Sequence, residues 1–235
     1  MKVAIFVEGQ TELIFVREYL LRKYDYKITI ECRTLFTDSD YRTTKYDYTN
    51  SSSDLVVSII NVGNDVAVLS RIKKRENYMW KSGYDKIIGF RDMYSEKYKE
   101  SSNVINANIT NRFIDGYNDQ ISKLSKPAKV KLYFAIMEIE AWFLALTSVL
   151  ERIDNRLTVN FILTRLRIDL NNIDPETEFF HPAQKLDDIY KLINQRYKKK
   201  EDDVEAILSK IGKEDYQELN GINKCNSFTK FFFEI

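Results

Sequence analysis

The chain begins with an apolar run at residues 3–7 that ends on Glu8 and Gly9. Apolar side chains then recur at helical spacing over residues 13–24, and Thr11 stands where a helix-capping residue is expected. The pattern predicts a buried strand, a tight turn and an amphipathic helix. Glu8 is therefore expected at the carboxyl tip of the first strand.

The same alternation of strand and helix patterns continues through the first two thirds of the chain. Further strands are predicted at residues 27–36, 55–62, 85–90 and 130–137, and helices at 66–81, 104–124 and 139–150. Residues 37–54 are polar and predict a surface insertion. Strands that alternate with helices of this length imply right-handed crossovers and a mainly parallel sheet.

The last third of the chain carries helical patterns alone. They fall at residues 157–170, 182–197, 204–211 and 223–235. The chain has only seven glycines and three prolines, which also favours long helices over an all-β fold. We expect an α/β protein with a mainly parallel sheet flanked by helices in residues 1–152 and an all-helical extension, packed on it, in residues 153–235.

Acidic residues follow three of the predicted strands. Glu8 and Asp92 end the first and fourth strands, and Glu138 and Glu140 lie between the last strand and its helix. Carboxyl ends of parallel strands share one edge of a sheet, so these acids are expected to converge and to require a cation. Oxygen ligands suit Mg²⁺ or Mn²⁺, and Glu12, one helical turn after Glu8, is placed to bind a second ion.

Each of these acids also has a structural interpretation. Glu8 suits a cap at the positive end of the following helix. Glu138 and Glu140 point in different directions on one helical turn, so one of them can be a cap or the partner of a lysine. We favour Glu138 as the ligand and Glu140 as its helper. A second Asp-x-Asp sequence at residues 38–40 ranks below Asp92, because the strand pattern ends at Asp92.

Three further positions are candidates for catalysis or nucleic-acid binding. His181 is the single histidine and therefore the conventional general base at neutral pH, although a packed or capping role is common for such a residue. Lys185, one turn later, is placed to bind a phosphate, or else is a solvated lysine. The basic run at residues 196–200 predicts a solvated helix end, or a nucleic-acid patch if it shares a face with the acids.

Composition excludes several other classes of protein. The net charge of +1 gives no global basic field for nonspecific nucleic-acid binding. Two distant cysteines and one histidine argue against a zinc site of the usual kind. The apolar runs are too short for a signal peptide or a membrane span, so we expect a cytoplasmic protein that does not use a membrane.

Four motifs together carry a family resemblance. They are VEGQTE at residues 7–12, Asp92-Met93-Tyr94, EIEAWFLA at residues 138–145, and the pair Cys225 and Phe228. In this order they resemble the Toprim domain, especially the Toprim nucleases of the OLD (overcoming lysogenization defect) type. The chain is most similar to stand-alone Toprim-like proteins that are encoded beside ABC- or AAA-type ATPases in bacterial defence loci.

The resemblance implies a metal-dependent nuclease that cleaves DNA or RNA, tRNA included. It implies metal binding by Glu8, Asp92 and one or both of Glu138 and Glu140, with Glu12 at a second ion. It also implies a toxic effector of an anti-phage, abortive-infection system that is controlled by an ATPase partner.

One position departs from the family motif. Toprim domains carry Asp-x-Asp where this chain has Tyr94 in the second acidic position. The loss of that ligand supports an alternative, a non-catalytic Toprim-like adaptor subunit of an ATPase complex. A primase- or topoisomerase-like role lacks a recognisable nucleophilic tyrosine domain or template-binding module. The aromatic run at residues 231–233 suits a core helix, or a docking surface for a partner or for a second copy in a homodimer.

Overall fold

A computed structural model describes residues 1–37, 40–63 and 67–234. The chain forms two compact units. The first comprises Met1–Arg91 and Asn111–Phe134, and the second comprises Asp92–Thr110 and Ala135–Ile235. These boundaries differ from the expected division near residue 152. A compact unit is defined by packing and not by independent folding, so the division into domains 1–152 and 153–235 stays a prediction.

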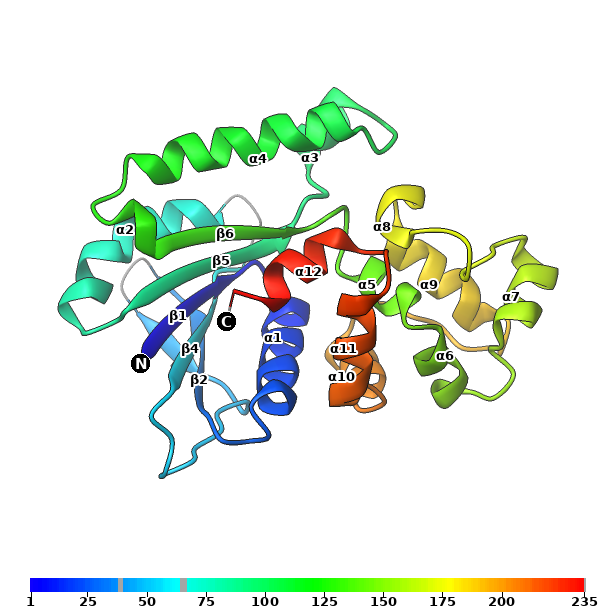
Figure 1. Ribbon diagram of the computed structural model, residues 1–235, viewed down its shortest axis with the longest axis horizontal. Helices are drawn as coiled ribbons and strands as arrows, with labels where there is room; N and C mark the ends of the chain where they lie inside the picture. The colour runs from blue at the N-terminus through cyan, green and yellow to red at the C-terminus, as the bar shows by residue number, and fades with distance from the viewer. Residues whose placement is uncertain (38–39, 64–66, 235) are drawn as a thin grey trace. The chain divides into compact units, whose positions relative to one another are not determined.

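The fold is built on a six-stranded sheet with the order β3-β2-β4-β1-β5-β6 (Figure 1). The strands are β1 (Lys2–Val7), β2 (Thr29–Leu35), β3 (Tyr41–Thr43), β4 (Val56–Asn61), β5 (Lys86–Asp92) and β6 (Val130–Ala135). Strands β2, β4, β1 and β5 pair in parallel, and β3 is antiparallel to β2. The predicted α/β class with a mainly parallel sheet is confirmed, and the arrangement is consistent with a Toprim-like fold.

Helices cover both faces of this sheet. The first unit contains α1 (Gln10–Lys23), α2 (Ala67–Lys81) and most of α4 (Ala107–Ser122). On β5, the Phe90 ring packs against Phe15 of α1, with the ring centroids 6.4 Å apart. The next side chain, Arg91, points to the other face and donates a hydrogen bond of 2.8 Å to the Tyr117 hydroxyl of α4. Helices α1 and α4 therefore lie on opposite faces, as right-handed crossovers require.

Several element boundaries differ from the predictions. Helix α1 begins at Gln10 after Gly9, so Thr11 is inside the helix and is not its cap. Strand β5 extends to Asp92. The polar segment 37–54 contributes β3 to the sheet; a three-residue edge strand with exposed side chains has no hydrophobic alternation to reveal it. The Asp-x-Asp sequence at residues 38–40, which ranks below Asp92 as a metal site, includes residues 38–39, and these lie outside the described residues.

The second unit is helical, as the sequence predicts for the last third of the chain. It contains α3 (Glu96–Ser101), α5 (Glu140–Ala145), α6 (Thr147–Ile153), α7 (Val159–Leu166), α8 (Pro175–Glu178), α9 (Pro182–Lys191), α10 (Glu201–Leu208), α11 (Lys213–Gly221) and α12 (Asn226–Phe232). Helices α3, α8 and α11 were not predicted. In the part of the chain that is described, no helix combines the length and the apolar character that crossing a membrane requires.

Trp142 is the centre of packing in the second unit. Its fully buried ring lies 5.2 Å from the Phe228 ring and 6.1 Å from the Phe231 ring, measured between centroids. The EIEAWFLA stretch and the Cys225–Phe228 motif therefore pack against each other. Phe231 is fully buried and Phe233 is 72% exposed, so the aromatic run is core at one position and surface at another. A homodimer or partner contact through it stays a prediction.

A buried polar chain reinforces this core. The Trp142 indole N–H donates to Ser227 Oγ at 3.0 Å, and Ser227 Oγ donates to the Glu176 carboxylate of α8 at 2.9 Å. Burial raises the pKa of Glu176 to about 7, although the hydrogen bonds from Ser227 oppose the rise. The folded protein therefore favours a neutral Glu176 near neutral pH.

Substitution of Gly89 tests the packing between the sheet and α2. A Cβ on this residue would overlap Leu132 Cδ1 and lie 3.0 and 3.1 Å from side-chain atoms of Ile72 and Val68. We expect Gly89→Ala to lower the free energy of unfolding by about 1–3 kcal/mol. Urea denaturation measures this change in the free energy of unfolding. Gly116→Ala, on α4 with open space around the new methyl, is the control and should raise stability. Equal stability of Gly89→Ala and wild type would contradict this packing.

Glu176 makes stability depend on pH. Between its model-peptide pKa of 4.5 and its folded pKa of about 7, the unfolded chain releases a proton that the folded protein keeps. The free energy of unfolding therefore falls as pH rises through this window, by up to about 3 kcal/mol. Urea denaturation at pH 5 and pH 8 should show that Glu176→Gln removes this part of the fall. Glu178→Gln, at the exposed end of the same helix, should retain the wild-type slope. Identical slopes for wild type and Glu176→Gln would refute the assignment.

Candidate metal centre

Two chain segments meet where β5 and β6 end. The Met93 and Tyr94 amides donate to the carbonyls of Ala135 and Met137, each at 2.8 Å, so the segments remain side by side beyond the strands. Met137 has a left-handed backbone (φ 60°), which turns the chain before Glu138. The strand predicted over 130–137 therefore stops at Ala135, and the turn carries the two following acids toward Asp92.

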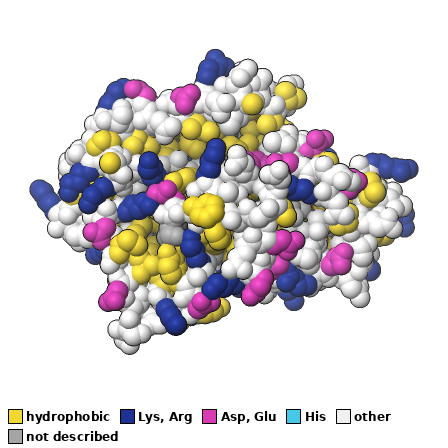
Figure 2. All heavy atoms as spheres, in the orientation of Figure 1, with side chains coloured by type: hydrophobic (Ala, Val, Ile, Leu, Met, Phe, Trp, Pro, Cys, Tyr) yellow, Lys and Arg dark blue, Asp and Glu magenta, His cyan; other side chains and the backbone are white. Residues whose placement is uncertain are grey.

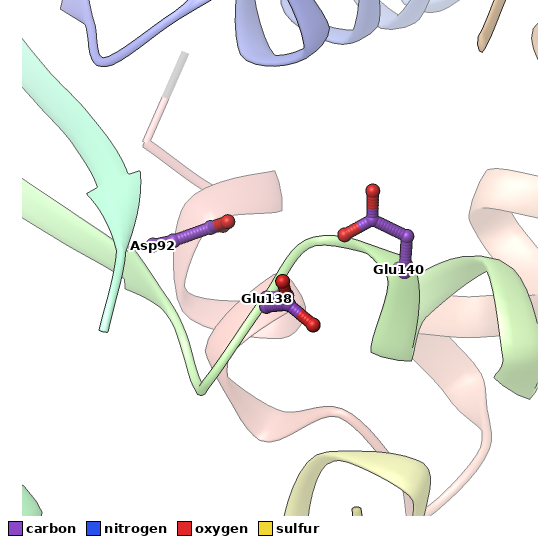
Figure 3. Close-up of side chains that lie close together, drawn as sticks. All are labelled: Asp92, Glu138 and Glu140. Carbon is purple, nitrogen blue, oxygen red and sulfur yellow. The ribbon is translucent and has the colours of Figure 1, made fainter. Parts of the chain in front are cut away.

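Asp92, Glu138 and Glu140 form a carboxylate cluster (Figure 3). One oxygen from each residue lies within 4.8 Å of the other two. Their side chains are 8%, 12% and 0% exposed, respectively. Both glutamates contribute an oxygen. Glu138 lies before α5, which begins at Glu140, so the divergence expected for two residues on one helical turn does not apply.

Each carboxylate is oriented by one hydrogen bond from a different element. Asp92 Oδ1 accepts the Ile139 amide before α5 at 3.0 Å. Glu138 Oε2 accepts the Ala183 amide in the first turn of α9 at 2.9 Å, and Glu140 Oε1 accepts the Tyr197 hydroxyl at 2.7 Å. These bonds fix one oxygen of each group and direct the other oxygen into the cluster.

The second oxygens face the ammonium of Lys199. Its Nζ lies 2.9 Å from Glu138 Oε1, 3.1 Å from Glu140 Oε2 and 3.7 Å from Asp92 Oδ2. The sequence predicts residues 196–200 as a solvated helix end, and for Lys199 this expectation is wrong. The error arises because a run of lysines is typical of a surface segment, whereas the fold brings Lys199 into contact with Glu138 and Glu140, some sixty positions earlier in the chain.

Two aspartates hold the segment that carries Lys199. Asp187 on α9 accepts bonds from the Arg196 guanidinium at 2.8 and 2.9 Å and from the Tyr197 amide at 3.0 Å. Asp203 on α10 accepts the amides of residues 198 and 200 at 2.8 and 3.2 Å. Lys199 itself has a left-handed backbone (φ 56°), a conformation that is unfavourable for a residue with a side chain. Anchors on both sides maintain it.

The charges of the cluster are unbalanced. Three carboxyl groups face one ammonium, and the buried Glu140 Oε2 has that Lys199 ammonium, 3.1 Å away, as its counter-ion. Burial raises the pKa of Glu140, the charge of Lys199 opposes the rise, and the charge of Glu138 adds to it. Burial lowers the pKa of Lys199, but the charges of Glu140, Asp92 and Glu138 outweigh this and raise it above its usual range. A further cation would relieve the remaining negative charge.

The ligand set suits a hard divalent cation. All three groups are carboxylates, which Mg²⁺ and Mn²⁺ prefer, and one oxygen of each lies within 4.8 Å of the other two. Asp92, Glu138 and Glu140 therefore form a group that could hold a metal ion. The hydrogen bonds from Ile139, Ala183 and Tyr197 correspond to the outer contacts that orient metal ligands in proteins.

Glu8 and Glu12 belong to the first unit. Glu8 follows β1 and is half-buried. Glu12 is 5% exposed in the first turn of α1, and its Oε2 lies 3.1 Å from the point that a Cβ of Gly9 would occupy. An acid in the first turn is also favourable to the helix dipole. The metal roles of Glu8 and Glu12 stay predictions.

His181 and Lys185 are on α9, near the Ala183 amide that binds Glu138. His181 is the N-cap residue, and its exposed ring packs edge-on against Tyr94 and Phe180, with centroids 5.1 and 5.0 Å away. Lys185 is half-buried one turn later. The packing of His181 agrees with its structural interpretation. The catalytic roles of both residues stay predictions.

On the face that Figure 2 displays, several Lys and Arg side chains gather at the left, and elsewhere basic, acidic and apolar side chains are mixed. The net charge of the chain is +1. Any nucleic-acid contact must therefore depend on local groups and not on a global positive potential.

Comparisons of the chain with known protein families, with curated proteins and with solved structures gave no match. The functional inference therefore depends on the motifs of the sequence and on the geometry of the carboxylate cluster.

Proposed function

We propose that this protein is a Mg²⁺- or Mn²⁺-dependent nuclease that hydrolyses phosphodiester bonds in DNA or RNA. The observation that supports the proposal most directly is the cluster of Asp92, Glu138 and Glu140, with one oxygen of each within 4.8 Å of the others. Oxygen-only clusters of this kind are typical of enzymes that act on phosphates.

The residues of the chain have distinct roles in this proposal. Asp92, Glu138 and Glu140 would hold the ion through the oxygens that face the cluster. A bound divalent ion supplies an activated water and neutralises charge on the phosphate. The Ile139 and Ala183 amides and the Tyr197 hydroxyl keep the carboxylates oriented, which lowers the cost of arranging ligands around the ion.

The Toprim resemblance extends the proposal beyond the cluster. It assigns Glu8 as a further ligand and Glu12 to a second ion, and it makes the protein the toxic effector of an anti-phage system under the control of an ABC- or AAA-type ATPase. An ATPase gene beside this one would support that part of the proposal. His181 as general base, Lys185 as a phosphate-binding group and a cytoplasmic location are added from the residue types and the short apolar runs of the sequence, independently of the resemblance.

A second candidate function is a non-catalytic Toprim-like adaptor subunit of an ATPase complex. Tyr94, in the position of the second acid, packs its ring against Phe180 and His181, with centroids 5.7 and 5.1 Å away. Tyr94 is half-buried in this aromatic group, and its side chain supplies no carboxylate, which supports the interpretation that one metal ligand has been lost. Lys199 also satisfies part of the negative charge that a metal would otherwise balance.

Substitution of Glu138 tests the nuclease proposal. Purified wild-type protein should cut DNA or RNA in the presence of Mg²⁺ or Mn²⁺, and Glu138→Gln should abolish cutting because it removes a charged ligand. Glu178→Gln, an exposed substitution in the helical unit, should retain activity. Gel assays on both nucleic acids measure the outcome. Undiminished cutting by Glu138→Gln would contradict the site, and metal binding without cutting of either nucleic acid would favour the adaptor.

Substitution of Tyr197 tests the orientation of the ligands. Tyr197→Phe removes the hydroxyl that donates to Glu140 Oε1 and leaves the ring in place. We expect the affinity for Mn²⁺, measured by calorimetry, to fall by about 10- to 100-fold. Tyr190→Phe, a buried tyrosine on α9, is the control and should retain wild-type affinity. An unchanged affinity in Tyr197→Phe would show that Glu140 needs no such support or is not a ligand.

A further inference from the structure

Lys199 occupies the position that a metal ion would need. Its ammonium faces Glu138 Oε1, Glu140 Oε2 and Asp92 Oδ2 at 2.9, 3.1 and 3.7 Å. Each of these oxygens belongs to a carboxylate whose other oxygen accepts a hydrogen bond from an amide or a hydroxyl. The ammonium and an ion bound by this cluster would therefore share their oxygen ligands.

The two cations exclude each other on grounds of distance and charge. Mg²⁺ requires oxygens at about 2.0–2.1 Å, so the carboxylates would have to close around a centre that the ammonium now occupies. An ammonium that remained there would lie within a few ångströms of a divalent charge in a buried site, where like charges repel strongly. Metal binding therefore requires Lys199 to leave the cluster.

The Lys199 side chain can leave the cluster while its backbone stays in place. Its side chain is 34% exposed, whereas the acids are 0–12% exposed, so the lysine lies on the solvent side of the cluster. The four-carbon stem rotates freely once the ammonium is released. Asp187 and Asp203 anchor the neighbouring backbone through bonds that do not involve the Lys199 side chain. The ammonium can thus swing out while the segment remains attached.

We propose that Lys199 is an exchangeable internal counter-ion, which stabilises the acidic cluster in the absence of metal and which a divalent cation must displace in order to bind. The inference rests on the metal site of the proposed function and adds its regulation. The protein folds with its acids compensated, and competition from Lys199 sets the concentration at which metal loads. The left-handed backbone of Lys199, which Asp187 and Asp203 hold on either side, places the ammonium among the three acids.

Calorimetric titration with MnCl₂ tests the competition. Lys199→Met keeps the length of the side chain and removes its charge, so it should bind Mn²⁺ about tenfold more tightly than wild type, or better. Lys198→Met, the neighbouring exposed lysine, should retain wild-type affinity. Thermal unfolding gives a second readout. Without metal, Lys199→Met should unfold at a lower temperature than wild type. Saturating Mn²⁺ should raise the unfolding temperature of Lys199→Met by more than it raises that of wild type.

Lysine labelling on the wild-type protein gives a test that needs no variant. In metal-free protein, acetic anhydride should modify Lys199 slowly, because three carboxylates surround its ammonium, and should modify exposed Lys198 rapidly. Saturating Mn²⁺ should accelerate the labelling of Lys199 severalfold and leave Lys198 unchanged, as measured by peptide mass spectrometry. Slow labelling of Lys199 in metal-saturated protein would overturn the inference, even if Lys199→Met failed to fold.

The outcomes separate this inference from the proposed function. Suppose that wild type binds Mn²⁺, that Glu138→Gln abolishes the binding, and that Lys199→Met binds Mn²⁺ no more tightly than wild type. The metal site is then supported, and the proposed exchange of Lys199 is wrong. If wild type, Lys199→Met and Glu138→Gln all lack a Mn²⁺ site, the proposed function fails, and the inference fails with it. If Lys199→Met binds Mn²⁺ more tightly than wild type and Glu138→Gln abolishes the binding, the proposed function and the exchange of Lys199 are both supported.

Discussion

The balance of charge around Asp92, Glu138 and Glu140 is the constraint on which the rest of the site depends. Burial of three carboxyl groups is unfavourable unless each oxygen has a donor or a cation. The protein supplies three fixed donors and one ammonium, so the single positive charge of Lys199 is shared by three carboxyl groups. A cluster with this arrangement is stable enough to fold and retains enough negative charge to attract a divalent cation.

The elements around the cluster follow from that requirement. The end of β5 supplies Asp92, and the left-handed turn at Met137 brings the next two acids beside it. The first turn of α9 donates the Ala183 amide, and the segment between α9 and α10 brings the Tyr197 hydroxyl and the Lys199 ammonium. The helical extension thus completes a site that begins at the ends of two strands.

The sequence predicts the sheet and names all three acids of the cluster, for definite reasons. Buried strands such as β1 and β5 are mainly apolar, and Glu8 and Asp92 stand out because the apolar runs stop just before them. The contribution of both Glu138 and Glu140 depends on the turn at Met137 and on the start of α5 at Glu140, and neither follows from local residue preferences. Lys199 and Tyr197 were missed because their contacts span about sixty residues and their local sequence is that of a solvated segment. Short elements such as α8 and β3 were missed because they are too short to show periodicity.

A crystal structure of the protein grown with MnCl₂, with anomalous scattering measured at the manganese edge, would show whether the carboxylate oxygens that now face an ammonium bind a divalent cation. We expect an anomalous peak among Asp92, Glu138 and Glu140, at about 2.2 Å from their oxygens, with the Lys199 ammonium moved away from the cluster. Diffraction from Mn²⁺-saturated crystals with no peak at the cluster and Lys199 still bound to the three acids would contradict this expectation.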